Sequence, residues 1–405
     1  MNILFISLLE VDINDGSSIY GSVLKELKKD GHNLFIVSNN ERRFKKPTSF
    51  EKRDGISYLR VRTGNIQKTN TIEKGISTLL LEKQYEKAIK KYSKNIKFDL
   101  ILYSTPPITF CNVIKFFKKR DNAKTYLMLK DIFPQNAVDL RYFSKNSIIY
   151  KYFRRKEVNL YKLSDRIGCM SPANKKYLLK NNSYIDENSV EIFPNSITPN
   201  KNNKRNMSAN YKIRKKYRIP ENATVFMYGG NLGKPQGINF VAECLKAAKD
   251  INNVYFVVCG NGTEYKVLES VKQNNQIDNL ILINGLPKEE YSELLNIADI
   301  GLVFLDYGFT IPNYPSRILS YCEKGIPILC CTDKNTDIGK IAKKNNYGWN
   351  IDSNDVHIFL KAIENIVDIP KESISKMGEN AYMYLVKNFN SKTNAKQLLI
   401  NKEQK

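Results

Sequence analysis

The residues best suited to chemistry lie in one segment, from Asn313 to Leu329, where a turn leads into a helix and then a strand. Pro315 and Ser316 favour a helix start, so we expect the first free N–H groups and the positive end of the helix dipole near Ser316 and Arg317. Arg317 adds a planar, permanently charged guanidinium suited to a diphosphate. The segment predicts a site for an anionic, nucleotide-like ligand. An ordinary capped helix with a solvated Arg317 is the alternative it leaves open.

Two glycine-bearing turns predict further anion contacts. Gly16 and Ser17 follow the first expected strand, and the turn at 229–237 follows the first strand of the second half. Both can expose backbone N–H groups to an anion. Neither has the Gly-x-Gly-x-x-Gly spacing of dinucleotide sites, and the chain has no Gly-x-x-x-x-Gly-Lys-Ser/Thr, which disfavours hydride transfer and P-loop chemistry. The turn at 284–287 could present main-chain groups to a nucleobase, with a simple loop as the default.

Strands and helices alternate twice along the chain, with a polar break at 194–206 that we interpret as a linker. The expected strands of the two halves are 2–7, 33–38, 56–61, 100–104, 125–129, 166–170 and 190–193, then 224–228, 254–259, 280–284, 300–304, 326–331 and 348–350. Gly325 is expected to end the helix that starts near Ser316. The pattern predicts two doubly wound parallel sheets facing across a cleft, with ligands beyond the carboxyl ends of the strands.

Composition narrows the class of partner. The 405 residues are 42% hydrophobic and carry a net charge of +23, of which residues 1–200 carry +16 and residues 201–405 carry +7. This charge predicts an acidic partner, and no helix-turn-helix, zinc-finger or ribonucleoprotein signature supports nucleic acid. Two histidines and seven cysteines without a Cys-x-x-Cys pair argue against a histidine metal site and a disulfide framework. Without a signal-peptide pattern or an apolar run of 18 residues, we expect a cytoplasmic protein.

Two stretches of the cationic half mix aromatic and basic residues in a helical context. They are 114–120, which contains Phe116, Phe117, Lys118, Lys119 and Arg120, and 150–156. Both are typical of helices that lie on an anionic membrane surface. A solvated amphipathic helix with its Phe residues in the core is the alternative for each.

Taken together, several motifs resemble bacterial glycosyltransferases of family 4, which have the GT-B fold of two Rossmann-like domains. The resemblance covers nearly the whole chain. It is greatest to the branch that builds O-antigen and capsular polysaccharide, including N-acetylfucosaminyl transferases. The motifs, in chain order, are Ser104-Thr-Pro-Pro107, Lys130-Asp-Ile-Phe-Pro134, Glu157-x-x-x-Tyr161-x-x-x-Asp165-Arg-Ile167, Phe193-Pro-Asn195, Tyr228-Gly-Gly-Asn-Leu-Gly233, Ile297-Ala-Asp-Ile300, Pro315-Ser-Arg317 and Gly325-Ile-Pro327.

The resemblance implies roles for individual residues. The leaving diphosphate would be met by Arg317 and Lys234, and Asp131 would meet the acceptor hydroxyl or, alternatively, cap a turn. The family's two glutamates fall on Pro312 and Ser320, so Glu323 from the next turn or Ser320 with water would hold the ribose. The family's usual Arg and Lys after the first strand of the second domain fall near Asn231 and Gln236. The full set of expected substrate-binding residues is Gly16, Ser17, Gly230, Asn231, Leu286, Asn313, Tyr314, Pro315, Ser316, Ser320 and Glu323.

The resemblance also implies a domain plan and an activity. Residues 1–200 would bind the acceptor, 201–380 the nucleotide sugar, and 381–405 would form a helix packing back on the first domain. The expected enzyme is a retaining hexosyltransferase that moves a UDP-linked N-acetylated deoxysugar or hexosamine to an undecaprenyl-diphosphate-linked acceptor at the inner face of the cell membrane. Neither a cofactor nor a metal is expected. A sugar-nucleotide epimerase of the same fold, and a non-catalytic protein that binds nucleotide sugar or anionic lipid, are the alternatives.

Overall fold

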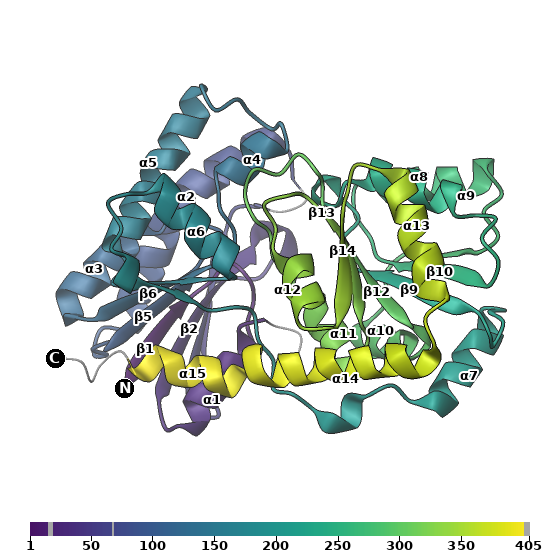
Figure 1. Cartoon of the computed structure of the whole chain (residues 1–405). Helices are drawn as coiled ribbons and strands as arrows, with labels where there is room; N and C mark the ends of the chain where they lie inside the picture. The colour runs from purple at the N-terminus through teal and green to yellow at the C-terminus, as the bar shows by residue number, and fades with distance from the viewer. Residues whose placement is uncertain (15–18, 67–68, 401–405) are drawn as a thin grey trace. The chain divides into compact units, whose positions relative to one another are not determined.

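The computed structural model describes residues 1–14, 19–66 and 69–400, and its two compact α/β units are coloured along the chain in Figure 1. Unit 1 comprises residues 1–197 together with 391–405, and unit 2 comprises residues 198–390. The first boundary falls inside the polar segment interpreted as a linker. The second falls at Asn390, ten residues beyond the expected end of the second domain, because the long helix before it continues to Asn388.

Unit 1 is built on an eight-stranded sheet with the order β3-β4-β2-β1-β5-β6-β7-β8. All neighbouring strands are parallel except β3, which pairs antiparallel with β4 at the edge. The strands are β1 (Asn2–Ile6), β2 (Asn33–Glu41), β3 (Ser49–Arg53), β4 (Ile56–Thr63), β5 (Leu100–Ser104), β6 (Lys124–Leu129), β7 (Arg166–Cys169) and β8 (Val190–Ile192). The helices of its first 197 residues are α1 (Gly21–Lys29), α2 (Thr71–Tyr92), α3 (Cys111–Asp121), α4 (Gln135–Asp139), α5 (Ile148–Leu163) and α6 (Pro172–Asn181).

The strand β3 was absent from the expected set, and its sequence explains why. Its residues Ser-Phe-Glu-Lys-Arg are mostly polar, and none of them is buried. An edge strand of this kind carries little of the apolar periodicity by which strands are recognised. The expectation of a wholly parallel sheet is therefore wrong at this one edge.

The last described helix, α15 (Ser391–Ile400), belongs to unit 1. Ala395 and Leu398 are buried in the core formed with strands β1 and β5 and helix α1. Asn394 donates from Nδ2 to the carbonyl of Pro194 and to Oγ of Ser196, at 2.9 Å each. The chain thus returns to unit 1 at its end, and this helix is fixed there by both apolar and polar contacts.

Unit 2 is a six-stranded, wholly parallel sheet with the order β11-β10-β9-β12-β13-β14. Its strands are β9 (Thr224–Gly229), β10 (Val254–Cys259), β11 (Leu280–Ile283), β12 (Ile300–Phe304), β13 (Ile328–Thr332) and β14 (Gly348–Asp352). Its helices are α7 (Met207–Lys216), α8 (Ile238–Ala247), α9 (Tyr265–Asn274), α10 (Lys288–Leu294), α11 (Ile318–Lys324), α12 (Ile338–Lys344), α13 (Val356–Val367) and α14 (Lys371–Asn388). The order of strands reverses at β9, so the topological switch point lies beside β9 and β12.

The loops that follow β9 and β10 approach each other closely at this switch point. The amide of Gly230 donates to the carbonyl of Cys259 at 2.9 Å. A Cβ atom on Gly260 would lie 1.8 Å from the carbonyl oxygen of Gly230. Only glycine fits at position 260, because any side chain would force the two loops apart.

Two alanine substitutions test this close approach. Gly260→Ala should destabilise unit 2 by about 1–3 kcal/mol, the usual penalty for an overpacked site. The matched substitution Gly75→Ala lies in helix α2, where a Cβ would meet nothing within 4 Å. It should stabilise by roughly 0.5–1 kcal/mol, because alanine favours the helix. Thermal and urea unfolding of both variants provide the measurement. A Gly260→Ala protein that melts with the parent would contradict this account of the loops.

Candidate functional site

In unit 2, the site is built around Arg317, which lies against the residues at the carboxyl end of β9. The guanidinium carbon of Arg317 lies 4.3 Å from the centre of the Tyr228 ring, a stacked cation–π arrangement. Its Nη1 is buried and has no hydrogen-bond partner among the described residues. Gly230 lies alongside, since a Cβ there would be 3.4 Å from the guanidinium carbon. The cation is thus held against the ring, and one of its nitrogens makes no hydrogen bond to the described residues.

A buried tyrosine from α11 fixes the end of β9 from below. The hydroxyl of Tyr321 accepts a hydrogen bond from the amide of Gly229 at 3.1 Å and donates to the carbonyl of Met227 at 3.0 Å. Burial raises the pKa of Tyr321 well above its usual value, so the phenol stays protonated as a donor. Tyr321 lies one helical turn after Arg317. The same short stretch therefore positions both the strand end and the cation above it.

The loop after β9 is held by a buried glutamine rather than by a basic residue. Oε1 of Gln236 accepts from Nδ2 of Asn231 at 3.0 Å and from the amide of Gly233 at 3.2 Å. The amide of Leu232 donates to the carbonyl of Asn261 in the next loop at 2.8 Å. Lys234 is exposed on this loop. Two substrate-binding positions expected here, Gly230 and Asn231, thus belong to one ordered loop beside Arg317.

The helix start differs from the expected one. Helix α11 begins at Ile318 with Arg317 as its N-cap, and the carbonyl of Ser316 accepts from the amide of Leu319 at 3.1 Å. Pro315 and Ser316 therefore form a turn before the helix, and the expectation that the helix starts with them is wrong by two residues. Because α11 has seven residues, its dipole is short, and the electrostatics here depend on the arginine itself.

The neighbours of this turn are partly committed to packing. The amide of Asn313 donates to Oγ1 of Thr336 at 3.0 Å, and the ring of Tyr314 packs 6.1 Å from that of Phe389. Burial raises the pKa of Tyr314 well above its usual value. Both residues thus shape the turn that carries Arg317.

Two expected sugar contacts on α11 have different surroundings. Ser320 is half-buried on the first turn of the helix, whereas Glu323 lies at its far end. Oε2 of Glu323 accepts from Nδ2 of Asn203 at 2.7 Å, and burial raises the pKa of this carboxyl. The structure therefore does not bring Glu323 to Arg317, because its carboxylate is engaged by the segment at 201–203.

The turn after β11 lies next to the loop after β10. Gly285 has a φ of +69°, and Asn261 is in contact range of it. Leu286, the position expected near a nucleobase, is half-buried on this turn. The loops after β9, β10 and β11 are thus connected in series at one edge of the sheet, as expected of a ligand-binding edge.

Unit 1 carries its own polar group at the carboxyl end of β6. Thr105 uses Oγ1 to donate to the carbonyl of Asp131 at 3.0 Å and to accept from the amide of Lys130 at 3.1 Å. Nδ2 of Asn136 donates to Oδ2 of Asp131 at 2.6 Å. Burial raises the pKa of Asp131 to about 6, so this carboxyl titrates close to physiological pH. The raised pKa and the position of Asp131 at the strand end fit a role in proton transfer or in binding a hydroxyl group. The hydrogen bond from Asn136 fits the alternative role of stabilising a turn.

Lys130 lies next to this carboxyl but points elsewhere. Its Nζ donates to the carbonyl of Phe193 at 3.1 Å, and burial lowers its pKa to about 7. Gly16 and Ser17, the anion contacts expected after β1, lie outside the described residues.

The first basic aromatic strip, at 116–120, is partly buried and makes several contacts within its own unit, although Lys119 and Arg120 are exposed. Phe117 is fully buried, and Lys118 donates to Oδ1 of Asp165 at 2.7 Å. Arg120 is bound to Asp121 and to the carbonyl of Ile96. Phe117 therefore belongs to the core and Lys118 and Arg120 are bound within the unit, whereas Lys119 is exposed. That this strip contacts a membrane stays a prediction.

One part of the unit 2 site was missed from sequence. Tyr228 was recognised only within a motif, although its ring supports Arg317. An aromatic residue placed directly before a Gly-Gly pair at a strand end was the available signal. From the sequence, Gln236 stands out only because the resemblance places a basic residue near it, whereas in the structure it is buried and fixes the loop.

The family model and the two similar proteins described next are all glycosyltransferases. Residues 210–384 match the model of the family Glycosyl transferases group 1. The chain is 24% identical over 303 residues to “Probable glycosyltransferase WbjE” of Pseudomonas aeruginosa, covering 71% of this chain and 70% of that protein. It is 23% identical over 131 residues, 32% of each chain, to “Putative colanic acid biosynthesis glycosyl transferase WcaI” of Escherichia coli K12.

Solved structures share the fold over nearly the whole chain. Sucrose-phosphate synthase from Thermosynechococcus elongatus superposes with a TM-score of 0.79 at 14% identity, covering 100% of this chain and 98% of that one. Anabaena HepE in complex with UDP and glucose gives a TM-score of 0.71 at 14% identity, covering 99% of each chain. At this identity the likeness establishes the two-domain α/β fold of GT-B glycosyltransferases.

The raised pKa of Asp131 predicts how an amide at this position affects stability. A carboxyl whose pKa rises from 3.8 to about 6 on folding stabilises the fold fully below pH 3.8 and loses that contribution as the pH rises through 6. The amide of Asp131→Asn does not ionise, so the variant does not lose stability in this way as the pH rises. Its melting temperature relative to the parent should therefore rise between about pH 4 and pH 7, by the equivalent of at most about 3 kcal/mol.

Asp30→Asn, at an exposed carboxylate of the same unit, is the control for the same chemical change made at the surface. If the difference for Asp131→Asn varies with pH no more than that for Asp30→Asn, the account of a carboxyl whose pKa is raised by folding is contradicted.

Proposed function

The chain carries a group 1 glycosyltransferase domain, and from that premise we propose that it is a retaining enzyme that uses a UDP-sugar as donor. The acceptor we propose is a lipid-linked glycan of a bacterial surface polysaccharide. The observation that carries the donor proposal is the guanidinium of Arg317, fixed on Tyr228 with a buried N–H group that has no partner in the described chain.

The leaving group explains why such a cation is useful. Breaking the anomeric bond places negative charge on the departing diphosphate, and a preorganised donor stabilises this charge more than it stabilises the bound substrate. Arg317 is preorganised by the Tyr228 ring and by Gly230. Lys234 on the neighbouring loop supplies a second positive charge. In this proposal the departure of the diphosphate needs no metal ion, because Arg317 and Lys234 neutralise its charge.

Asp131 is proposed to interact with the acceptor. With a pKa of about 6 it is ionised at neutral pH and can accept a hydrogen bond from a sugar hydroxyl. We propose that the anomeric configuration of the sugar is retained because of the resemblance to family 4. In such a reaction Asp131 would orient the acceptor hydroxyl and would not form a covalent intermediate.

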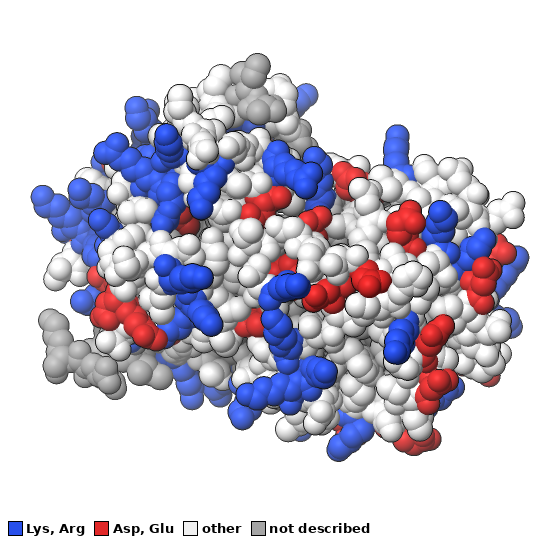
Figure 2. All heavy atoms as spheres, turned by 45° about the horizontal axis from the view of Figure 1, so that its top comes forward, with Lys and Arg blue, Asp and Glu red and all other residues white. Residues whose placement is uncertain are grey.

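The choice of UDP and of a polysaccharide acceptor draws on the relatives. A protein of the same fold, HepE, has been solved with UDP and with UDP-glucose. The name of WcaI refers to colanic acid, a polysaccharide. The cationic unit 1 suits an acceptor held at an anionic membrane (Figure 2). None of the helices in the described part of the chain is both long and apolar enough to cross a bilayer.

Removing the cation should impair turnover. Arg317→Ala is expected to lower kcat about 10²-fold, the scale of losing one main electrostatic stabiliser of a leaving group. Arg317→Lys should recover only part of this loss, because it keeps the charge without the planar fork. Release of UDP from UDP-sugars with acceptor present gives the rate.

Arg218→Ala, at an exposed arginine of unit 2, is the matched control and should retain parental activity. If Arg317→Ala turns over as fast as this control, Arg317 has no part in the site. Binding of UDP-sugar without any release of UDP by the parent would instead favour a non-catalytic binding protein.

The proposed use of cations in place of a metal predicts resistance to chelation. Within residues 1–14, 19–66 and 69–400, no group of three or more His, Cys, Asp or Glu side chains gathers as a metal site would require. Activity should therefore be retained after EDTA treatment. Loss of activity with EDTA and its recovery with Mg²⁺ or Mn²⁺ would show that the diphosphate is neutralised by a bound ion.

A further inference from the structure

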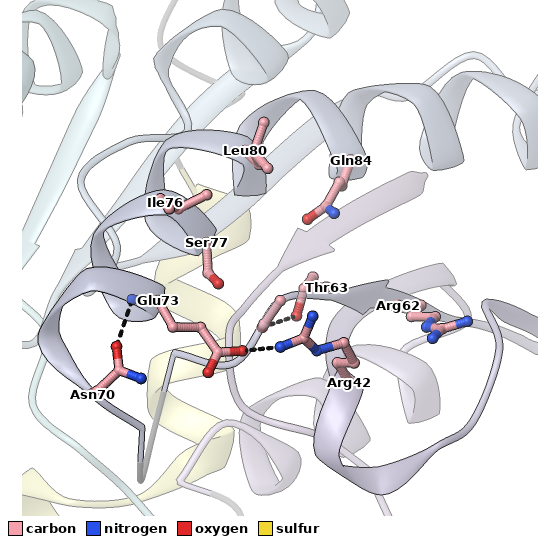
Figure 3. A pocket seen from close by; sticks show the side chains of 10 residues that line it. Arg42, Arg62, Thr63, Asn70, Glu73, Ile76, Ser77, Leu80 and Gln84 are labelled. Carbon is pink, nitrogen blue, oxygen red and sulfur yellow. Dashed lines mark hydrogen bonds and ion pairs between the residues drawn. The ribbon is translucent and has the colours of Figure 1, made fainter.

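A pocket of about 920 Å³ opens in unit 1 between the first turns of helix α2 and the ends of strands β2 and β4 (Figure 3). Its floor is made where Gly64, directly after β4, meets Ser77 of the helix. A Cβ on Gly64 would lie 2.1 Å from Oγ of Ser77, so glycine allows the helix to approach the strand end. The pocket thus has a defined base of polar groups at the carboxyl edge of the sheet.

Two guanidinium groups border this pocket. Arg42 forms an ion pair with Glu73 through Nη2 at 2.6 Å, which leaves its remaining N–H groups for other partners. Arg62 is exposed, and its side chain makes no hydrogen bond or ion pair to the residues that the structure describes. Thr69 and Asn65 also donate hydrogen bonds to the Glu73 carboxylate. The bond from Thr69, the charge of Arg42 and the bond from Asn65 lower the pKa of Glu73. The border therefore carries a net positive charge that suits an anionic group such as a diphosphate.

The same pocket continues into an apolar surface. Ile76, Leu79 and Leu80 follow the i, i+3, i+4 spacing of one helix face and are 56%, 59% and 48% exposed. Three large aliphatic side chains at this exposure on one face are unusual for a surface that meets only water. Ile76 and Leu80 line the pocket itself, so the apolar face and the cationic border bound one space.

A further polar group in this space has no partner. Oε1 of Gln84, which lies two turns beyond Ser77 on α2, is buried without a hydrogen bond to the described residues. A buried acceptor without a donor is costly unless a ligand or water supplies one. Its position predicts a ligand that also carries a hydroxyl or amide donor.

We propose that this α2 pocket binds the diphosphate group of a lipid-anchored acceptor. Arg42 and Arg62 hold the phosphates, while the first isoprenoid-like units of the chain lie along Ile76, Leu79 and Leu80. The proposal rests on the function proposed above and specifies its acceptor site. The occupant is an amphiphile rather than a free phosphate, because the cations adjoin an exposed aliphatic face. It is a small ligand rather than a protein partner, because the polar base is enclosed between a helix and two strand ends.

The location is consistent with catalysis in the same unit. Strands β4 and β6 run parallel in one sheet, so the pocket after β4 and Asp131 after β6 lie at the same carboxyl edge. Ligands of doubly wound sheets bind along this edge. Strands β2, β1 and β5 lie between β4 and β6, so the two groups are roughly 19 Å apart along this edge. A diphosphate held by Arg42 and Arg62 would therefore be at the correct edge of the sheet, and the glycan of the acceptor would have to span the distance to Asp131.

Calorimetric titration with farnesyl diphosphate tests the proposal, with saturating UDP present so that the nucleotide site is occupied. The full-length chain should bind farnesyl diphosphate more tightly than either inorganic pyrophosphate or farnesol. Arg62→Ala should weaken this binding about tenfold, the effect of losing a charge-assisted bond. Leu79→Asp should weaken farnesyl diphosphate binding while leaving pyrophosphate binding unchanged, which separates a lipid headgroup from a free phosphate.

Two exposed positions provide matched controls. Arg155→Ala removes the same charge from helix α5, and Met383→Asp makes the same kind of apolar-to-acid change on unit 2. Both should bind farnesyl diphosphate as the parent does. Parental binding by Arg62→Ala and Leu79→Asp would overturn the proposal, as would equal affinity of the parent for pyrophosphate and farnesyl diphosphate. Failure of UDP to bind at all would count against the proposed function, and not against the α2 pocket.

Discussion

The stacking of the Arg317 guanidinium on the Tyr228 ring is the interaction on which the site in unit 2 depends. A guanidinium is free to sample many rotamers when it is solvated, and ordering it on binding a ligand would oppose affinity. The aromatic ring below it and the bare backbone of Gly230 beside it restrict this motion in advance. One guanidinium nitrogen makes no hydrogen bond to the described residues, so an anion that binds to it would displace no hydrogen bond among them.

The surrounding loops follow from this arrangement. Tyr321 bonds to both the amide of Gly229 and the carbonyl of Met227, so α11 cannot shift without disturbing the end of β9. Gly260 allows the neighbouring loop to close on Gly230. Gln236 orders the loop after β9 by accepting two hydrogen bonds. These contacts position Arg317, the cation at the centre of the proposed site, relative to the end of β9.

The fold was largely predictable because its strands are buried on both sides and read as continuous apolar runs. Strands β5, β10 and β12 have the bounds expected from sequence, whereas the polar edge strand β3 was missed. Site details were less predictable, because they depend on which long-range partner a side chain finds. Glu323 is engaged by Asn203, 120 positions away, and Lys118 by Asp165. The α2 pocket was missed for the same reason, since strand pairing brings Arg42 and Arg62 together from separate segments.

The central claim is that Arg317 binds the diphosphate of the donor, and nucleotide titrations test it most directly. Calorimetry would compare uridine, UMP and UDP on the parent and on Arg317→Ala. The account predicts that each added phosphate strengthens binding to the parent, and that most of the gain from the diphosphate disappears in the variant while uridine binds equally to both. If Arg317→Ala retains the full preference for UDP over uridine, the diphosphate lies elsewhere and the account of this site is contradicted.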